Sequence, residues 1–228
     1  MLLPGGGSSV HGYYGDAERA LAAAAAVVAV DPPGFDALRA RRWLPLPVHA
    51  RRLADALRAC GECPAVVVGH SHGTLPALRL ALDAPQLVSA LLLLDPSPPL
   101  FPLLLPRAAL TAAGHARTAV PTWSRRVDPL PRSVPLAVRV WWYLVTGAAS
   151  LATDLAARPP AVPTVVVSAG EHEPSSSHRR THQRLVRLLP NARLEIWPET
   201  THALQLERPS AIVDAALALL QLTRSRST

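Results

Sequence analysis

The sequence contains no lysine, and all 23 of its basic residues are arginine. These arginines give a formal net charge of +7, but they are scattered and nowhere form the block of five or six like charges that marks a nucleic-acid-binding tail. Net charge bears on solubility and steering rather than on fold. We therefore expect no nucleic-acid partner and a small molecule as the ligand.

Cysteine and long apolar runs are also scarce. The two cysteines, Cys60 and Cys63, build no disulfide framework, which is typical of a reducing compartment. The apolar run at 21–30 is far shorter than the roughly 20 residues that a membrane span needs. The first residues, Met1 to Gly5, lack the basic start and apolar stretch of a secretion signal. We expect a cytoplasmic protein without a membrane span.

Aromatic residues are few, at 4%, while apolar residues make up 49% of the chain and charged residues 17%. This composition is that of a globular protein whose core is built from Leu, Val and Ala. A length of 228 residues suits one domain, or one core with a modest insertion.

Short β-branched or leucine-rich runs alternate with amphipathic stretches along most of the chain. Strands are predicted at 1–3, 26–30, 64–68, 87–94, 164–168 and 193–197, and helices at 16–25, 47–59, 72–82, 177–189 and 210–222. Such alternation predicts the α/β class, a mostly parallel sheet flanked by helices on both faces. Active sites of such sheets lie outside the carboxyl ends of the strands.

The alternation stops between 96 and 160. This segment is rich in proline and carries Trp123, Trp141, Trp142 and Tyr143. We interpret it as a helical cap inserted into a core formed by 1–95 and 161–228. Its apolar residues either line an acyl pocket or pack the cap onto the core. They are Leu100, Phe101, Leu103, Trp141 and Trp142.

The sharpest motif is Gly-His-Ser-His-Gly at 69–73, between a valine run and a helical stretch. This is the context of a nucleophile elbow, a turn so tight that its flanking residues must be nearly free of side chains. The elbow lifts Ser71 clear of the sheet and marks it as a candidate nucleophile. His202 follows the last predicted strand, at the same edge of the sheet, and is the candidate base.

With these motifs in this order, the chain resembles the α/β-hydrolase superfamily, in the branch with a serine nucleophile and a cap insertion. The resemblance runs from the glycine-rich turn at Gly5 through the elbow and the 170–174 segment to the segment 202–209. It implies an acid after the strand at 164–168, where the family often shows Gly-x-x-Asp. Here the fourth position is Glu173, our choice, with Glu171 and Asp95 as rivals.

The resemblance also implies an oxyanion hole made of two backbone amides, those of Gly6 and His72. In many relatives the first loop reads His-Gly-x, whereas here Pro4 replaces the histidine. A proline side chain need not remove the backbone donor that follows it, so the hole stays in the prediction.

The expected activity is that of a serine hydrolase, a carboxylic-ester hydrolase for a small or medium apolar acyl substrate that works through an acyl-enzyme. An amidase, a C–C bond hydrolase and a non-catalytic hydrolase-like binding protein are the alternatives. No cofactor is expected. No metal is expected either, although His178 and His182 stand four residues apart on a predicted helix.

The first predicted strand is short and lacks the two strands that usually precede it in this superfamily, so we expect an N-terminally trimmed sheet. Edge strands expose unpaired amides and carbonyls. The oligomeric state stays open, with self-association through the N-terminal edge as the expected route. Extending the chain upstream in frame should raise its melting temperature. Thermal melts and size-exclusion chromatography of both forms test this, and an unchanged, monomeric short form would contradict it.

Overall fold

A computed structural model describes residues 1–5, 9–10, 12–31, 44–61, 63–96 and 136–225. Within these residues the chain forms a five-stranded sheet in which every pairing is parallel and the order is β1-β2-β3-β4-β5. The strands are β1 (Leu2–Leu3), β2 (Ala65–His70), β3 (Val88–Leu94), β4 (Thr164–Ala169) and β5 (Ala192–Trp197). The predicted parallel α/β architecture is thus confirmed.

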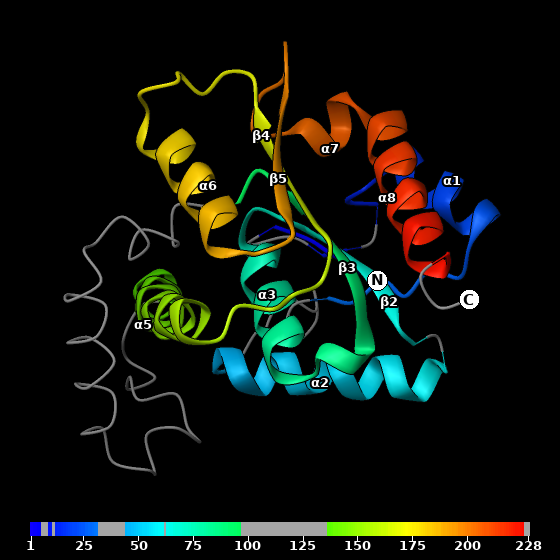
Figure 1. The fold of residues 1–228 in the computed structure, drawn as a ribbon, viewed down its shortest axis with the longest axis horizontal. Helices are drawn as coiled ribbons and strands as arrows, with labels where there is room; N and C mark the ends of the chain where they lie inside the picture. The colour runs from blue at the N-terminus through cyan, green and yellow to red at the C-terminus, as the bar shows by residue number, and fades with distance from the viewer. Residues whose placement is uncertain (6–8, 11, 32–43, 62, 97–135, 226–228) are drawn as a thin grey trace.

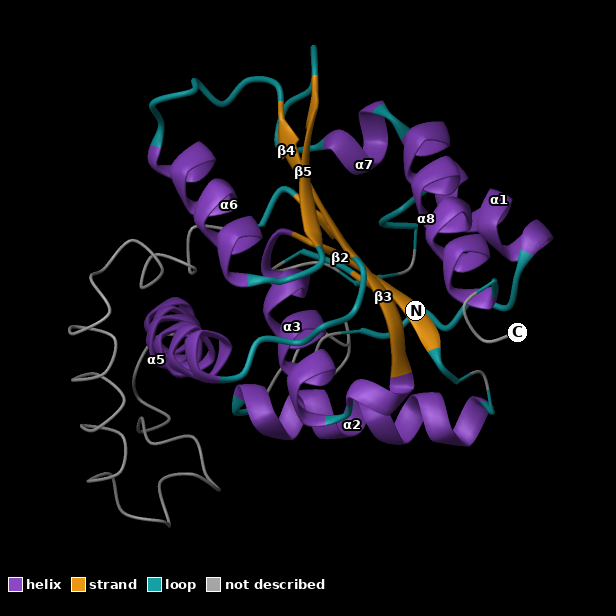
Figure 2. Ribbon diagram, in the orientation of Figure 1, coloured by secondary structure: helices purple, strands orange, loops and turns teal. Residues whose placement is uncertain are grey.

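Helices cover both faces of this sheet (Figures 1 and 2). On one face lie α1 (Asp16–Ala24) and α8 (Pro209–Arg224), which pack against each other, and α8 also packs against β2 and β3. The other face carries α2 (Leu46–Cys60), α3 (Thr74–Asp83), α5 (Leu136–Ala157) and α6 (Ser177–Leu188). Short helical turns complete the described elements: η1 (Ser71–Gly73), η2 (Pro85–Leu87) and α7 (Leu204–Glu207).

The central strands are buried on both faces, which explains their unbroken apolar sequences. Successive side chains of a strand point to opposite faces. Along β3, Leu91 and Leu93 enter the core under α2 and α3, while Leu92 and Leu94 enter the core under α1 and α8. With a core on each side, the positions from Ala90 to Leu94 all favour apolar residues, so this part of β3 shows no alternation.

The first strand has neighbours on both sides. Leu2 pairs with Val68 of β2 and forms an isolated parallel bridge with Ala29 on the other side. The stretch 26–30, predicted as a strand, therefore contributes one bridge rather than a ladder. The amine of Met1 donates to the carbonyl of Val66 at 2.7 Å, and burial lowers the pKa of this amine to about 5.

The predicted cap falls largely outside the described residues, because 97–135 are not among them, and the cap stays a prediction. Leu100, Phe101 and Leu103 lie there, and the side chains of Trp141 and Trp142 are likewise outside the description. The C-terminal half of α5 packs into the main core. Its buried residues are Ala148, Leu151, Ala152 and Leu155. In the part of the chain that is described, no helix combines the length and apolarity of a membrane span.

A buried arginine ties two helices of this layer together. Arg79 on α3 has a side chain only 9% exposed and donates to both carboxylate oxygens of Asp83, one turn further along α3. It also donates to Asp154 on α5. One guanidinium thus compensates two carboxylates at the junction of the helices.

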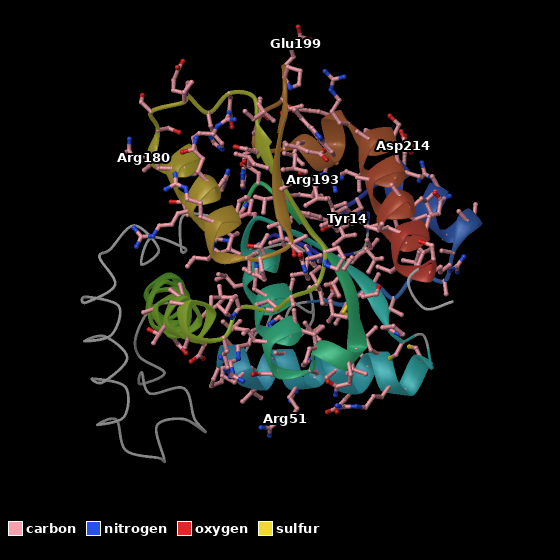
Figure 3. All side chains as sticks on the ribbon, viewed as in Figure 1. Tyr14, Arg51, Arg180, Arg193, Glu199 and Asp214 are labelled. Carbon is pink, nitrogen blue, oxygen red and sulfur yellow. The ribbon has the colours of Figure 1, made fainter. Side chains whose placement is uncertain are left out.

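Replacing Arg79 with methionine should therefore destabilise the fold. The carboxylates of Asp83 and Asp154 would lose their shared counter-charge, and removing one partner of a largely buried ion pair costs about 2–3 kcal/mol at partial exposure. Urea denaturation of the Arg79→Met variant measures the loss. The matched control is Arg51→Met, on the outward side of α2 (Figure 3), which should change stability by less than about 0.5 kcal/mol. Equal losses in the two variants would contradict the prediction.

Candidate active site

The predicted elbow forms between β2 and α3. Ser71 has a positive φ of 51°, a conformation that residues with a Cβ rarely adopt. A Cβ on Gly69 would lie 2.8 Å from the carbonyl oxygen of Gly73, and a Cβ on Gly73 would lie 2.5 Å from the carbonyl oxygen of Leu3. Both glycines are therefore required by backbone approaches, and the strained serine stands between them at the carboxyl end of β2.

The loop that follows β5 meets the serine there. The Nε2 atom of His202 lies 3.0 Å from the Oγ atom of Ser71. His202 sits between β5 and α7, and its backbone N–H donates to Glu171 at 2.7 Å. The side chain of Ser71 is buried, whereas that of His202 is 47% exposed when only the described residues are considered. The two residues predicted as nucleophile and base are thus within hydrogen-bond distance.

The carboxylate that meets the His202 ring is Asp95, not Glu173. The Oδ2 atom of Asp95 lies 2.5 Å from Nδ1 of His202, while Glu173 is exposed on the β4–α6 loop. Because Ser71 and Asp95 already occupy the two ring nitrogens, no ring atom is left for a third partner. The structure therefore corrects the choice of Glu173, and it places Glu171 on the backbone of His202 rather than on its ring.

Three donors compensate the burial of Asp95, whose side chain is only 1% exposed. Burial by itself raises the pKa of a carboxyl group. Here hydrogen bonds from His202, from the backbone N–H of Ala169 and from His172 outweigh that effect and hold the pKa of Asp95 well below its usual range. Asp95 is therefore a carboxylate at neutral pH.

The carboxylate in turn acts on His202. Its hydrogen bond raises the pKa of His202 above the usual value of 6.5, although partial burial works in the opposite direction. A carboxylate only accepts hydrogen bonds, so Nδ1 of His202 carries the proton and Nε2 of the neutral ring is free to accept from the Ser71 hydroxyl. A hydroxyl, an imidazole and a carboxylate in this order can generate an activated oxygen nucleophile.

A second histidine fixes the backbone of His202. The Nε2 atom of His70 lies 2.8 Å from the carbonyl oxygen of His202, and its Nδ1 atom lies 2.5 Å from the hydroxyl oxygen of Tyr13. Because a carbonyl only accepts, Nε2 donates and Nδ1 accepts from Tyr13. Burial lowers the pKa of His70 to about 4, so the ring is neutral. Nothing in the sequence signals this contact between residues 13, 70 and 202.

Three more histidines gather behind Asp95, and they differ in their surroundings. The ring of His172 contacts Asp95 and stacks on that of His178, with centroids 4.6 Å apart. His182 is buried between the Ser168 hydroxyl and the Pro96 carbonyl, and burial lowers its pKa to about 4. Across the described residues, no group of three potential ligands is arranged to hold a metal ion. His178 and His182 both contact the His172 ring, but only the His182 ring is hydrogen-bonded between Ser168 and Pro96.

The predicted oxyanion hole is described only in part. Gly6 lies outside the described residues, but the preceding Gly5 reaches the nucleophile, since a Cβ there would lie 3.3 Å from Cβ of Ser71. His72 is the second residue of η1, which leads into α3. Amides of the first helical turn have no acceptor within the helix, and the helix dipole favours negative charge beside them. The role of both amides stays a prediction.

The chain is similar to one known family and to several solved structures. The model of the alpha/beta hydrolase family matches residues 1–215. Among solved structures, Est816, described as an N-acyl homoserine lactone degrading enzyme, is 23% identical with a TM-score of 0.64, covering 94% of this chain and 90% of its own. NosK from Streptomyces actuosus is 22% identical with a TM-score of 0.60, covering 98% and 97%. MenH from S. aureus is 18% identical with a TM-score of 0.64, covering 98% and 93%. At these identities the structures show a shared fold.

The geometry predicts how the ring of His202 titrates. Replacing Asp95 with asparagine removes the charge that raises the pKa of His202, so this pKa should fall by about one unit or more. Glu173→Gln, the matched control on the exposed loop, should leave it within about 0.2 units, an exposed and distant charge being screened. NMR titration of the imidazole resonances measures both. A larger shift in the Glu173 variant would restore Glu173 as the partner of His202.

Proposed function

The chain belongs to the alpha/beta hydrolase family, and we propose that it is a serine hydrolase that cleaves carboxylic esters with small or medium apolar acyl groups. The observation that carries the proposal is the hydrogen-bonded series Ser71–His202–Asp95 at the carboxyl ends of β2, β5 and β3. This series has the order of a catalytic triad. A binding protein without catalytic activity would have no need for it.

In the first step, Nε2 of His202 takes the proton of the Ser71 hydroxyl as the oxygen attacks the ester carbonyl. The imidazole becomes a cation, and Asp95 stabilises it without itself taking the proton. The buried carboxylate is suited to this role because its own proton is lost far below neutral pH. His70 contributes by holding the carbonyl of His202, which keeps the ring over the serine.

The attack turns the carbonyl oxygen into an oxyanion. The backbone amides of His72 and Gly6 are proposed to donate to it, the first from the helical turn that follows Ser71 and the second from the loop after β1. Each such donor contributes about 3 kcal/mol of transition-state stabilisation. The close approach of Gly5 to Ser71 supports this assignment of the loop.

Collapse of the tetrahedral intermediate expels the alcohol, which takes the proton held by His202, and leaves an acyl group on Ser71. Water then attacks this acyl-enzyme. His202 removes a proton from the water as it attacks and then gives that proton to the Ser71 oxygen, so the acid leaves and the Ser71 hydroxyl is restored. Both steps use the same base, so the reaction needs no cofactor.

An ester as substrate is supported by chemistry and by one relative. Esters have better leaving groups than amides, and so need less assistance to the departing group. The N-acyl homoserine lactone that Est816 degrades, by its description, contains a cyclic ester beside an amide, so the substrate panel includes both bond types. Whether amides or C–C bonds are also cleaved is decided by a substrate panel. We infer a preference for apolar acyl groups from the apolar composition of the predicted cap.

The proposal predicts that Ser71→Ala abolishes hydrolysis of p-nitrophenyl esters while the protein stays folded. Losing the nucleophile of such a triad costs a factor of about 10⁶ in turnover. Wild-type protein should react with a fluorophosphonate at Ser71, as mass spectrometry of the labelled peptide would show. The matched control is Ser89→Ala on β3, where the serine lies at the opposite end of the sheet from the triad.

Two outcomes would contradict this proposal. If Ser71→Ala keeps more than a tenth of the wild-type turnover, another residue is the nucleophile. If wild-type protein neither turns over esters, amides or C–C substrates nor reacts with the fluorophosphonate, the protein is not a serine hydrolase. Acyl chains of rising length, tested on the wild type, then define the acyl preference.

A further inference from the structure

The Asp95 carboxylate serves two imidazoles through one oxygen atom. Oδ2 lies 2.5 Å from Nδ1 of His202 and 3.0 Å from Nε2 of His172. The other oxygen, Oδ1, accepts the backbone N–H of Ala169 at 2.9 Å. Since a carboxylate only accepts, His172 donates from Nε2. The negative charge that supports His202 is therefore shared with a second ring, that of His172. Among the described residues, this second ring has no hydrogen bond to Ser71 or to His202.

The structure holds His172 firmly in this place. A buried guanidinium, that of Arg179 on α6, donates to the backbone carbonyl of His172 at 2.8 Å and to that of Ala169 at 3.1 Å. The ring of His178 stacks on one face of His172 at an interplanar angle of 13°. The side chain of His172 is only 12% exposed. Loop, ring and carboxylate are thus fixed together.

We propose that His172 is a positioning residue that holds Asp95 against His202 and, by taking part of the carboxylate's charge, sets how strongly His202 binds a proton. This inference rests on the proposed function, in which His202 is the base. His172 does not touch the reacting atoms and acts only through Asp95.

The charge on His172 decides the size of the effect. A neutral ring withdraws some electron density from Oδ2, whereas a protonated ring places a full positive charge beside it. Each change weakens the support that His202 receives and favours its neutral form. The other titratable or charged groups around His172 are His178 and His182 on α6, His202, the adjacent Glu171 and Glu173 in the loop, and Arg179 on its carbonyl.

Three variants separate these roles. His172→Phe keeps an aromatic ring against His178 but removes the donor to Asp95. His172→Gln keeps a donor near the position of Nε2 but cannot be protonated. His178→Phe is the matched control, since it changes a neighbouring histidine that has no hydrogen bond to Asp95. For each variant we would measure kcat and KM for a p-nitrophenyl ester against pH, and the titration of the His202 ring by NMR.

We expect His172→Phe to raise the pKa of His202 by about 0.5–1 unit and to move the acid limb of the kcat/KM profile to higher pH by the same amount. On the alkaline plateau kcat should fall about tenfold with KM nearly unchanged, because Asp95 loses one of its anchors. His172→Gln should recover kcat to within about threefold of the wild type. Because His172→Gln keeps a donor, it should also leave the pKa of His202 within about 0.3 units of the wild-type value.

The proposal is overturned if the pH profile and the His202 titration of His172→Phe coincide with those of the wild type and of His178→Phe. If His172→Phe does not fold, His172→Ala, which also removes the donor to Asp95, takes its place, and a His202 titration identical to that of the wild type overturns the proposal. The NMR titration needs no turnover. A protein without hydrolase activity would therefore refute the proposed function while the coupling between His172 and His202 is still measured.

Discussion

The burial of one carboxylate, that of Asp95, organises the carboxyl end of the sheet around the candidate site. Removing an ionised carboxylate from water is costly unless hydrogen bonds replace its hydration. At Asp95 the replacement donors come from three places: Ala169 at the end of β4, His172 in the loop that follows, and His202 in the loop after β5. The three segments that supply these donors converge on the charge, and their convergence brings the His202 ring to Ser71.

The elbow imposes a second constraint that joins fold and chemistry. Gly73 lies so close to the carbonyl groups of Leu3 and Pro4 that it has no space for a side chain. The turn that presents Ser71 is therefore packed directly on the segment that leads out of β1, and Thr74 reinforces it by donating to the Ser71 carbonyl at 2.6 Å. This close packing overdetermines the turn and so maintains the positive φ of Ser71.

The sequence predicted the features that local chemistry determines. Buried strands, the elbow and the position of His202 after the last strand each leave a pattern within a few residues. The carboxylate partner of His202 left no such pattern. Two parallel strands, β3 and β4, end beside each other, and each is followed by carboxyl groups. The pattern typical of the family favoured Glu173, whereas only the folded structure shows that Asp95 reaches the ring of His202. Contacts such as Tyr13 with His70, 57 residues apart, leave no trace in spacing.

The geometry at Asp95 also explains why its side chain, and not that of Glu173 in the next loop, contacts His202. Asp95 follows β3 directly, with a positive φ of 40°, and its N–H still donates to Val167 of β4. A short side chain at the strand end is held by the sheet itself, whereas Glu173 stands four residues beyond β4 on an exposed loop. The β4–α6 loop therefore does not supply the carboxylate. Arg179 holds this loop so that His172 donates to Asp95. The position of Asp95 at the end of β3 therefore also determines what His172 can contact in the loop after β4.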